Sequence, residues 1–380
     1  MNLVAPFGFY GAGNIGDEAT LQGFARLLSG WRKHVRVSVA SRDPRHTASV
    51  EPSFRYFKAA GRDPRRWWAK YRSDAFVFPG GTPIMDVLGS WPLCELIPII
   101  KSAEARGKPV HFVGTGTEKL KREESRRLFA DVIAPRVRHW SVRCERDKVR
   151  LTDYGVADNQ VTVSADMAWL LDAVTVDFGR QQLHPFGISS DDSLIGVNIN
   201  CEPSMLREQP RFFEIMGKML DTLVEREKTR IVFLCNEVRE DETFDKAASQ
   251  KVMALMSHRD RTLLLPNRYW SPQQMLSVVG CCRATISTRY HFNLFSALQR
   301  VPFLALKRSD KVDDLCWDLG WSHGVALNEM DSSTLIEMLL DMMNRSSELA
   351  SKLSLSTKQM QSRAVRNRVA LESCAAEAGL

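Results

Sequence analysis

Short apolar segments typical of buried strands alternate with helical segments over most of the chain, and this alternation limits the fold more than any other feature of the sequence. Strands separated by helices at short spacing indicate a parallel sheet with helices on both faces. The alternation runs from residue 3 to about residue 163 and starts again at residue 193. Residues 174–192 lose the periodicity and carry Gly, Pro, Ser and Asp, which indicates a domain boundary.

We therefore expect an α/β protein with two doubly wound, Rossmann-like domains that face a cleft, residues 1–180 and 181–380. The 380 residues are enough for two such domains. The second domain is expected to carry a helical C-terminal extension from residue 332 to about residue 375.

The most informative unit consists of a strand over 283–286, a turn, a helix with apolar residues at 292, 295 and 298, and a strand over 301–306. Its turn puts Arg289 and His291 at the end of a strand and the beginning of a helix. Ligands of open α/β sheets bind at such strand ends, and the free N–H groups of a helix N-terminus attract anions. The unit predicts a phosphate or carboxylate site. The alternative is that Arg289 caps a neighbouring element and His291 is an ordinary half-buried histidine.

A glycine-rich turn, Gly11-Ala12-Gly13-Asn14-Ile15-Gly16, fits the dinucleotide-binding pattern between a strand and a helix. Asp17 and Glu18 stand in the first turn of that helix, where their carboxylates would occupy the N–H groups that a pyrophosphate needs and would repel it. We interpret the turn as a loop whose backbone approaches a different ligand, with Asn14 and Asp17 as polar contacts. A tight turn with an acidic cap is the simpler alternative.

Five stretches together resemble the polysaccharide pyruvyl transferase family. They are residues 13–19, 78–82, 141–143, 164–166, and 287–302 followed by Lys311. They occur in the family's order and span most of residues 10–315. The resemblance implies the two-domain glycosyltransferase fold called GT-B, with the donor in the cleft. It also implies an enzyme that uses phosphoenolpyruvate to build a pyruvate ketal on two hydroxyls of a sugar in a surface polysaccharide precursor.

The same resemblance implies the site residues. The expected donor-binding cations are Arg143, Arg289, His291 and Lys311. His291 is also the expected general acid/base, because imidazole titrates near neutral pH, and Asp17 is expected to orient or deprotonate the acceptor. Contacts to the acceptor or within the loops are expected from Gly13, Asn14, Gly16, Gly80 and Gly81. Phosphoenolpyruvate is a substrate in this scheme, and no cofactor and no metal are expected.

The chain departs from the family's pattern at Pro79, Cys144, Tyr290 and Lys307-Arg308. Three other functions stay open: a GT-B glycosyltransferase that uses a nucleotide sugar, a non-catalytic sugar- or anion-binding protein, and a dinucleotide oxidoreductase, which Asp17 and Glu18 disfavour. We interpret Asp166 as a turn cap and His111 as a structural histidine.

The charge balance is modest, with 52 Lys and Arg against 45 Asp and Glu, and no basic arm concentrates it. This composition suits anionic small molecules or a membrane surface and gives no support to nucleic acid as a partner. Scattered cysteines without a Cys-x-x-Cys pair indicate buried thiols in a reducing compartment. No apolar run approaches a membrane span, so we expect a cytoplasmic enzyme. A homo-oligomer is compatible with these features.

Residues 55–72 combine many arginines with Trp67, Trp68 and Tyr71. That composition suits peripheral contact with the anionic inner face of the plasma membrane, where a lipid-linked sugar acceptor of the kind implied by the family would lie. The other interpretation is an amphipathic helix whose two tryptophans pack inward while the arginines face solvent. We favour the second interpretation.

Overall fold

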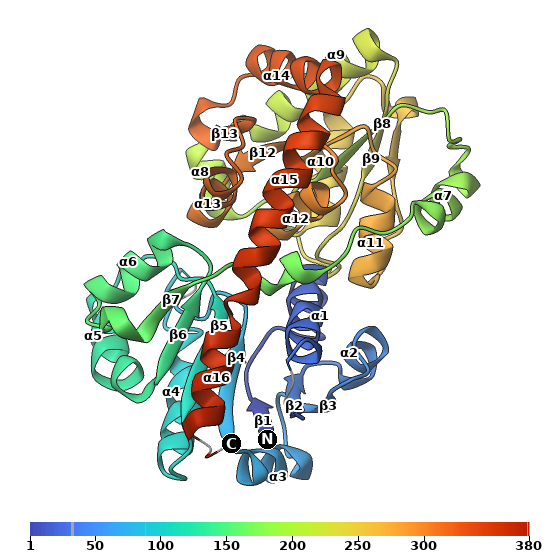
Figure 1. The fold of residues 1–380 in the computed structure, drawn as a ribbon. Helices are drawn as coiled ribbons and strands as arrows, with labels where there is room; N and C mark the ends of the chain where they lie inside the picture. Colours follow the sequence, from blue (N-terminus) through green and yellow to red (C-terminus); the bar gives the residue numbers. More distant parts are fainter. Residues whose placement is uncertain (32–33, 88, 378, 380) are drawn as a thin grey trace. The chain divides into compact units, whose positions relative to one another are not determined.

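The chain folds into two compact units, each built on one parallel sheet, in the computed structural model, which describes residues 1–31, 34–87, 89–377 and 379 (Figure 1). The first unit consists of residues 1–12, 17–171 and 360–380, and the second of residues 13–16 and 172–359. The expected α/β class with two Rossmann-like halves and a helical C-terminal extension is confirmed.

The first sheet has seven parallel strands in the order β3-β2-β1-β4-β5-β6-β7. In that order they are Arg55–Lys58, Arg36–Ser41, Asn2–Ala5, Ala75–Pro79, Val110–Thr115, His139–Val142 and Val161–Val163. The chain starts at β1, builds outward to β3, and returns to place β4 on the other side of β1. The direction of winding therefore reverses between β1 and β4, and open α/β sheets bind ligands beyond the strand ends at such a point.

Helices cover both faces of the first sheet. One apolar cluster joins the sheet to α1 (Ile15–Ser29), α2 (Pro44–Val50) and α16 (Arg368–Glu377). The opposite cluster joins it to α3 (Pro64–Arg72), α4 (Leu93–Glu104), α6 (Glu145–Asp153) and the π-helical turn that continues α5 (Glu123–Leu128). Within this second cluster, Phe78, Phe112 and Trp140 stack across three neighbouring strands, with ring centroids 4.5 and 4.3 Å apart.

The second sheet has six parallel strands in the order β10-β9-β8-β11-β12-β13. In that order they are Thr262–Leu264, Arg230–Phe233, Leu194–Asn198, Ala284–Ser287, Phe303–Lys307 and Gly324–Ala326. The winding reverses between β8 and β11, which pair directly from Ala284 opposite Ile195 to Ser287 opposite Asn198.

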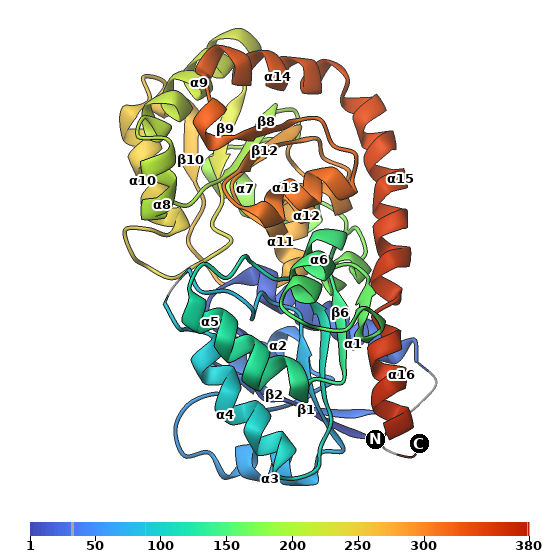
Figure 2. The same ribbon diagram turned by 90° about the vertical axis from the view of Figure 1, so that its left-hand side faces the viewer.

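Two groups of helices lie on either side of the second sheet (Figure 2). In one group α9 (Phe212–Glu227) packs against α10 (Asp245–Leu255) and α14 (Ser332–Asn344). In the other group α11 (Pro272–Val279) packs against α7 (Asp177–Leu183) and α12 (Tyr290–Leu298), and α12 packs against α13 (Asp310–Asp318). The remaining helices of the chain's second half are α8 (Pro203–Glu208) and the long α15 (Ser346–Val365), which precedes α16. None of the helices that the structure describes combines the length and the apolar composition of a bilayer span.

Several elements that the structure contains were not predicted from the sequence, namely β3, α2, α7, α8, α9, α13 and β13. β3 illustrates the reason. Its sequence Arg-Tyr-Phe-Lys exposes both charged ends and buries the two aromatic residues, as an edge strand does. Because many arginines surround this short apolar pair in the sequence, no alternation of apolar and polar residues marks it as a strand. α7 lies inside the stretch that we assigned to the domain boundary.

The limits of the two units differ from the expected ranges 1–180 and 181–380 at both ends of the second half. Residues 172–180 belong to the second unit, where the Gln299 side chain accepts from the Val174 N–H and donates to the Val174 carbonyl, both at 3.0 Å. Residues 360–380 belong to the first unit. There Asn367 is fully buried; its Oδ1 accepts from Ser141 and Ser164, and its Nδ2 donates to the carbonyl of Ala165.

We expect that replacing Asn367 with leucine lowers the free energy of unfolding of the first unit by about 3 kcal/mol, because two buried hydroxyls and a buried carbonyl each lose a hydrogen bond to Asn367. Urea denaturation of the full chain measures this change. The control is Arg366→Leu at the exposed neighbouring position, for which we expect almost no change. Equal stability of the two variants would show that Asn367 does not hold the C-terminal helix in the first unit.

His111 makes the first unit sensitive to acid. The ring is fully buried in β5, and neither nitrogen has a hydrogen-bond partner among the described residues. Burial lowers the pKa of His111 to about 3, from 6.5 in an unfolded chain, so the unfolded state binds the proton more tightly. Stability from the neutral ring is complete above pH 6.5 and is lost as the pH falls toward 3.

We therefore expect the free energy of unfolding of the first unit to fall by about 1.4 kcal/mol per pH unit below pH 6.5. His111→Leu should flatten this slope in denaturation curves between pH 5 and pH 7, while the exposed His184→Leu should leave it unchanged. An identical slope in all three proteins would contradict the assignment.

Candidate active site

Polar side chains of the second unit gather where β8, β9, β11 and β12 end. Asn200 and Glu202 follow β8, Glu237 follows β9, Arg289 follows β11 and Arg308 follows β12. Thr288, next to Arg289, donates from its hydroxyl to the Asn200 side chain at 2.7 Å. The cluster thus lies at the point where the winding of this sheet reverses, which is the expected ligand position for the fold.

Arg289 is the N-cap residue of α12 and is only 8% exposed. Its Nε donates to Asp245 at 3.0 Å, its Nη2 donates to the same oxygen, and its Nη1 lies 2.9 Å from Glu237. Burial opposes the charge of Arg289, but Asp245 and Glu237 outweigh burial and raise its pKa. Three of the five guanidinium N–H groups therefore point at carboxylates, and the cation is held in one orientation.

Asp245, the first residue of α10, makes most of the contacts that hold this arrangement together. Its carboxylate is fully buried and also accepts from the Asn198 side chain at 2.8 Å and from the Asn236 and Glu237 N–H groups at 2.9 and 3.0 Å. One side chain therefore ties the ends of β8, β9 and β11 together.

His291, in the first turn of α12, lies against the tip of the glycine-rich turn. A Cβ atom added to Gly16 would come within 2.2 Å of the imidazole Nδ1. The tip, residues 13–16, belongs to the second unit. Asn14 accepts from the Gly16 N–H at 2.9 Å and from the Asn236 side chain at 3.2 Å, and the Gly13 carbonyl accepts from the Val238 N–H at 2.8 Å. The structure thus brings predicted residues Gly13, Asn14, Gly16 and His291 together.

A second group of cations surrounds Glu202. Arg308 donates from Nε to the Thr288 carbonyl at 3.0 Å, and its Nη1 lies 2.7 Å from the Glu202 carboxylate. Burial opposes ionisation of Glu202, but Arg308, Lys311 and Arg289 together lower its pKa. Lys311 is half-buried in the first turn of α13. Three cations therefore act on one half-exposed carboxylate, while Asp245 and Glu237 balance the charge of Arg289 from its other side.

The other predicted residues belong to the first unit. Gly80 and Gly81 follow β4 with φ of 70° and 73°, and a Cβ atom on Gly80 would come within 2.0 Å of the Thr20 side chain. Gly80 is thus needed for the close approach of α1. Arg143 follows β6, is 7% exposed, lies 2.8 Å from Asp166 and donates to the Gly114 carbonyl at 3.2 Å. Asp166 also accepts from the Ala168 N–H, which agrees with our interpretation of a turn cap.

A carboxylate of the chain itself binds the beginning of the glycine-rich turn, at Gly11 in the first unit. Fully buried Glu18 accepts from the Gly11 N–H at 2.7 Å, so the anion predicted to interfere with a pyrophosphate is bound there. Asp17 is half-buried beside it. Burial raises the pKa of Tyr10 well above its usual value, and the charges of Asp17 and Glu18 raise it further.

Sequence reasoning missed Glu202, Glu237, Asp245 and Arg308. Glu202 and Glu237 follow predicted strands within a few residues, so position relative to strand ends was an available signal. Asp245 had no such signal, because it begins a helix and reaches Arg289 only through the fold. Among the described residues, no group of three or more His, Cys, Asp or Glu side chains is arranged to hold a metal ion.

The family model for polysaccharide pyruvyl transferases matches residues 14–310. No curated protein matches the chain. Solved structures with a similar fold include the Anabaena protein HepE in complex with UDP-glucose, with a TM-score of 0.64 at 11% identity over 99% of both chains. UDP-GlcNAc 2-epimerase from Neisseria meningitidis bound to UDP-GlcNAc has a TM-score of 0.62 at 12% identity over 93% of this chain and 94% of its own. A glycosyltransferase from Rickettsia africae has a TM-score of 0.59 at 9% identity over 99% and 98%. These similarities establish a GT-B-like fold.

Proposed function

We propose, from the premise that this chain belongs to the polysaccharide pyruvyl transferase family, that it moves the pyruvyl group of phosphoenolpyruvate onto two hydroxyls of a sugar in a surface polysaccharide precursor. The observation that supports a small, highly charged donor most directly is that Arg289, Arg308 and Lys311 gather beyond the ends of the neighbouring strands β11 and β12. Phosphoenolpyruvate carries a carboxylate and a phosphate, so a site that binds it needs several cations.

In this proposal Arg289, Arg308 and Lys311 bind the donor, and His291 is the general acid/base. Because Asp245 and Glu237 fix the Arg289 guanidinium, it can present its remaining N–H groups without reorganisation. The His291 imidazole is held by packing, because its ring lies directly against the backbone at Gly16. Arg143 remains a proposed donor contact, Asp17 a proposed acceptor contact, and Gly80 and Gly81 proposed loop contacts.

The proposed reaction needs a proton on the methylene carbon of phosphoenolpyruvate, which becomes a methyl group and leaves an oxocarbenium-like C2. One sugar hydroxyl bonds to C2 and loses its proton, and the bond from C2 to the phosphate oxygen breaks. The second hydroxyl then bonds to C2 and loses its proton. Of the two hydroxyl protons, one replaces the proton given to the methyl group and the other leaves with phosphate, so no water is consumed. An imidazole can carry out these transfers near neutral pH.

We propose that the enzyme acts in the cytoplasm without a bound cofactor and that its acceptor is a lipid-linked oligosaccharide. The direct test is incubation with phosphoenolpyruvate and a panel of glycan acceptors. Acceptor-dependent phosphate release together with a ketal-bearing sugar in the mass spectrum is expected. The absence of turnover across a broad panel would contradict the proposal.

His291→Gln is expected to lower kcat by about 10²–10⁴-fold, because the variant loses a proton donor and acceptor while it keeps a similar shape. Phosphate release at saturating donor measures the effect. The control is His184→Gln at an exposed position, which should retain full activity. An active His291→Gln enzyme would remove His291 from the proton transfers.

A second candidate function is transfer from a nucleotide sugar, which the fold similarity to HepE in complex with UDP-glucose favours. It predicts thermal stabilisation by UDP-glucose or UDP-GlcNAc, whereas the pyruvyl transferase predicts stabilisation by phosphoenolpyruvate. A non-catalytic binding protein predicts ligand binding without turnover, and His291→Gln would leave that binding nearly intact.

A further inference from the structure

Helix α3 is held at one edge of the first unit with no buried residue. Asp63 caps it by accepting from the Arg65 N–H at 3.0 Å, and Pro64 occupies its first turn. Only Ala69 packs against the apolar core. The favoured interpretation of inward-facing tryptophans is therefore wrong: Trp67 is 54% exposed and Trp68 51% exposed. Trp68 and Trp67 precede the core contact Ala69 by one and two residues, so they point about 100° and 200° away from it around the helix.

The exposed aromatic side chains of α3 contact one another, and these contacts fix the positions of their rings. Trp67 and Tyr71, one turn apart, stack with an interplanar angle of 4° and centroids 5.2 Å apart. Trp68 meets the Trp67 ring edge-on at 5.3 Å. Tyr71 is 59% exposed. The helix thus presents a preformed aromatic ridge, defined here as Trp67, Trp68 and Tyr71, that no other described part of the chain covers.

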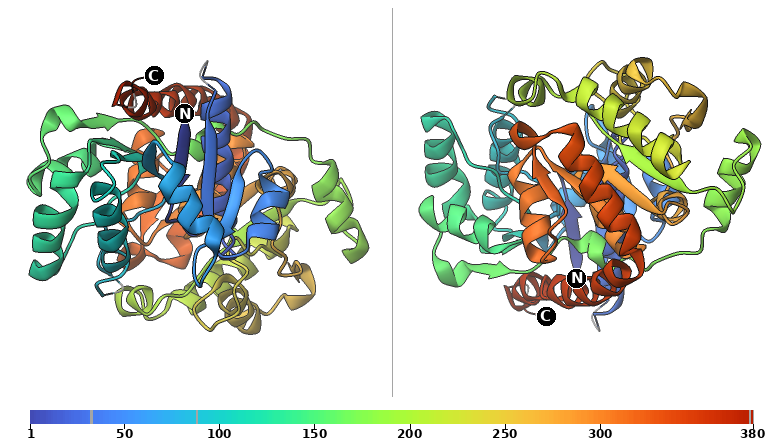
Figure 3. Two further views of the ribbon diagram at one scale, coloured as in Figure 1. Left: turned by 90° about the horizontal axis from the view of Figure 1, so that it is seen from below. Right: turned by 90° about the horizontal axis from the view of Figure 1, so that it is seen from above.

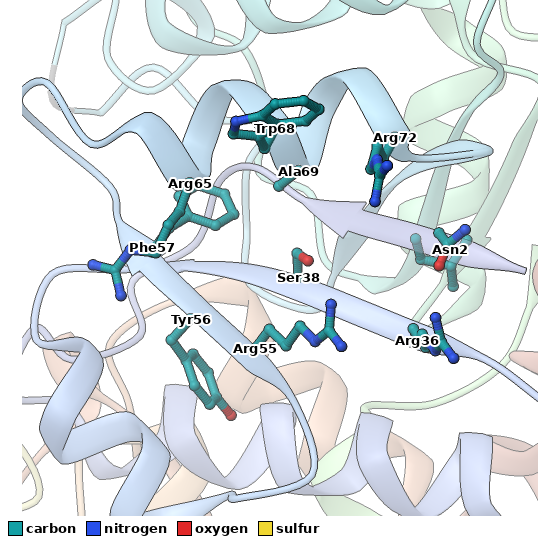
Figure 4. Close-up of a pocket in the computed structure, with 11 residues that line it drawn as sticks. Asn2, Arg36, Ser38, Arg55, Tyr56, Phe57, Arg65, Trp68, Ala69 and Arg72 are labelled. Atoms are coloured by element: carbon teal, nitrogen blue, oxygen red, sulfur yellow. The ribbon is translucent and has the colours of Figure 1, made fainter.

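A basic groove of about 650 Å³ runs along one side of this ridge (Figure 4). Arg36 and Arg55 line it from the beginnings of β2 and β3, and Arg72 lines it from the end of α3. Within the described part of the chain, none of these three arginines lies within ion-pair distance of a carboxylate. The Arg72 guanidinium instead lies 5.4 Å above the Trp68 ring.

A second groove, of about 580 Å³, follows the other side of α3 and contains Arg42, Arg66 and Lys70. Lys70 is half-buried there, and burial together with Arg66 and Arg106 lowers its pKa to about 8. Positive charge therefore flanks the aromatic ridge on both sides, and an anion in this groove would relieve the repulsion between its cations.

The first groove, which contains Arg36, Arg55 and Arg72, lies at the amino-terminal edge of the first sheet, since Asn2, Arg36 and Arg55 are the first residues of their strands. The predicted site residues of this unit, such as Gly80 and Arg143, follow the carboxyl ends of their strands. Figures 1 and 3 show α3 at the end of the unit that carries the N-terminus. The first groove therefore belongs to a surface of this unit separate from those predicted site residues. The second groove is lined by residues that follow β1, β2 and β3, such as Gly8, Arg42 and Ala59.

We propose that α3 docks the protein on an anionic phospholipid bilayer, with the aromatic ridge at the boundary of headgroups and acyl chains and Arg36, Arg55 and Arg72 on lipid phosphates. Tryptophan and tyrosine prefer this interfacial layer, and surface arginines are attracted by anionic lipids. A single-stranded nucleic acid would also suit arginines and aromatic rings, but its bases need open ring faces. Here Trp67 and Tyr71 stack on each other and Arg72 covers Trp68, so the bilayer is the better partner. The inference is independent of the proposed reaction.

The test is flotation of the full chain with vesicles of phosphatidylcholine alone or mixed with phosphatidylglycerol. Binding to the mixed vesicles, reversed by high salt, is expected. The triple variant Arg36→Gln, Arg55→Gln, Arg72→Gln should weaken binding by about 100-fold, because each lost cation contributes about fivefold. Trp67→Ser with Trp68→Ser should weaken binding at every lipid composition.

Matched controls come from the second unit: Trp317→Ser, which removes an 85% exposed tryptophan, and a triple glutamine variant at exposed Arg207, Arg226 and Arg268. Both should bind like the parent, and thermal denaturation should show that all variants are folded. Failure of the parent to bind mixed vesicles, equal binding to phosphatidylcholine alone, or unchanged binding by the α3 variants would each overturn the proposal. So would stabilisation by inorganic phosphate or tighter binding to a single-stranded oligonucleotide without vesicle binding.

Discussion

Asp245→Ala is expected to lower the free energy of unfolding of the second unit by about 3–5 kcal/mol and to abolish turnover, because it leaves the Arg289 guanidinium buried without its main partner. The variant also removes the acceptor that holds the Asn198 side chain and the Asn236 N–H. Urea denaturation and the phosphate-release assay measure the two effects.

Two control variants test whether Asp245→Ala acts by leaving Arg289 unpaired or merely by removing one negative charge. Glu242→Ala removes a carboxylate from an exposed position near α10 and should change neither stability nor activity. The double variant Asp245→Ala, Arg289→Met removes both buried charges, so it should be more stable than Asp245→Ala alone while it remains inactive. A double variant that is no more stable than Asp245→Ala would show that the ion pair is not the source of the loss.

Gly16→Ala is expected to lower kcat by about 100-fold or more, because the added methyl group would lie 2.2 Å from the His291 ring and a misplaced acid/base loses much of its effect. No backbone strain contributes, since Gly16 does not have a positive φ. The effect should therefore appear in the turnover number of folded protein, measured with saturating phosphoenolpyruvate and acceptor.

The matched control is Gly217→Ala in α9, where an added methyl group would have its nearest contact at 3.4 Å and should leave activity unchanged. If the loss acts through the imidazole, Gly16→Ala should have little further effect in a His291→Gln protein. Additive losses would mean that Gly16 acts independently of His291.

The candidate site was predictable from the sequence to the extent that it depends on short-range features. Arg289 and His291 follow a strand and begin a helix, and Gly16 lies in the first turn of another helix. The contacts of Arg289 with Glu237 and Asp245 were not predictable, because these carboxylates are distant from it in sequence and reach it only through the order β9-β8-β11. The same holds for Arg143 and Asp166, which meet because β6 and β7 are neighbours.

The sequence by itself determined the fold class, the family and the positions of the glycines and cations relative to strand ends, because alternation, turns and motifs are local properties of the chain. Only the tertiary structure decided which carboxylates neutralise those cations, that the C-terminal helix packs in the first unit, and that Trp67 and Trp68 remain exposed. These features depend on which distant elements cover a given side chain, and burial of that kind is set by the packing of the whole unit rather than by neighbouring residues.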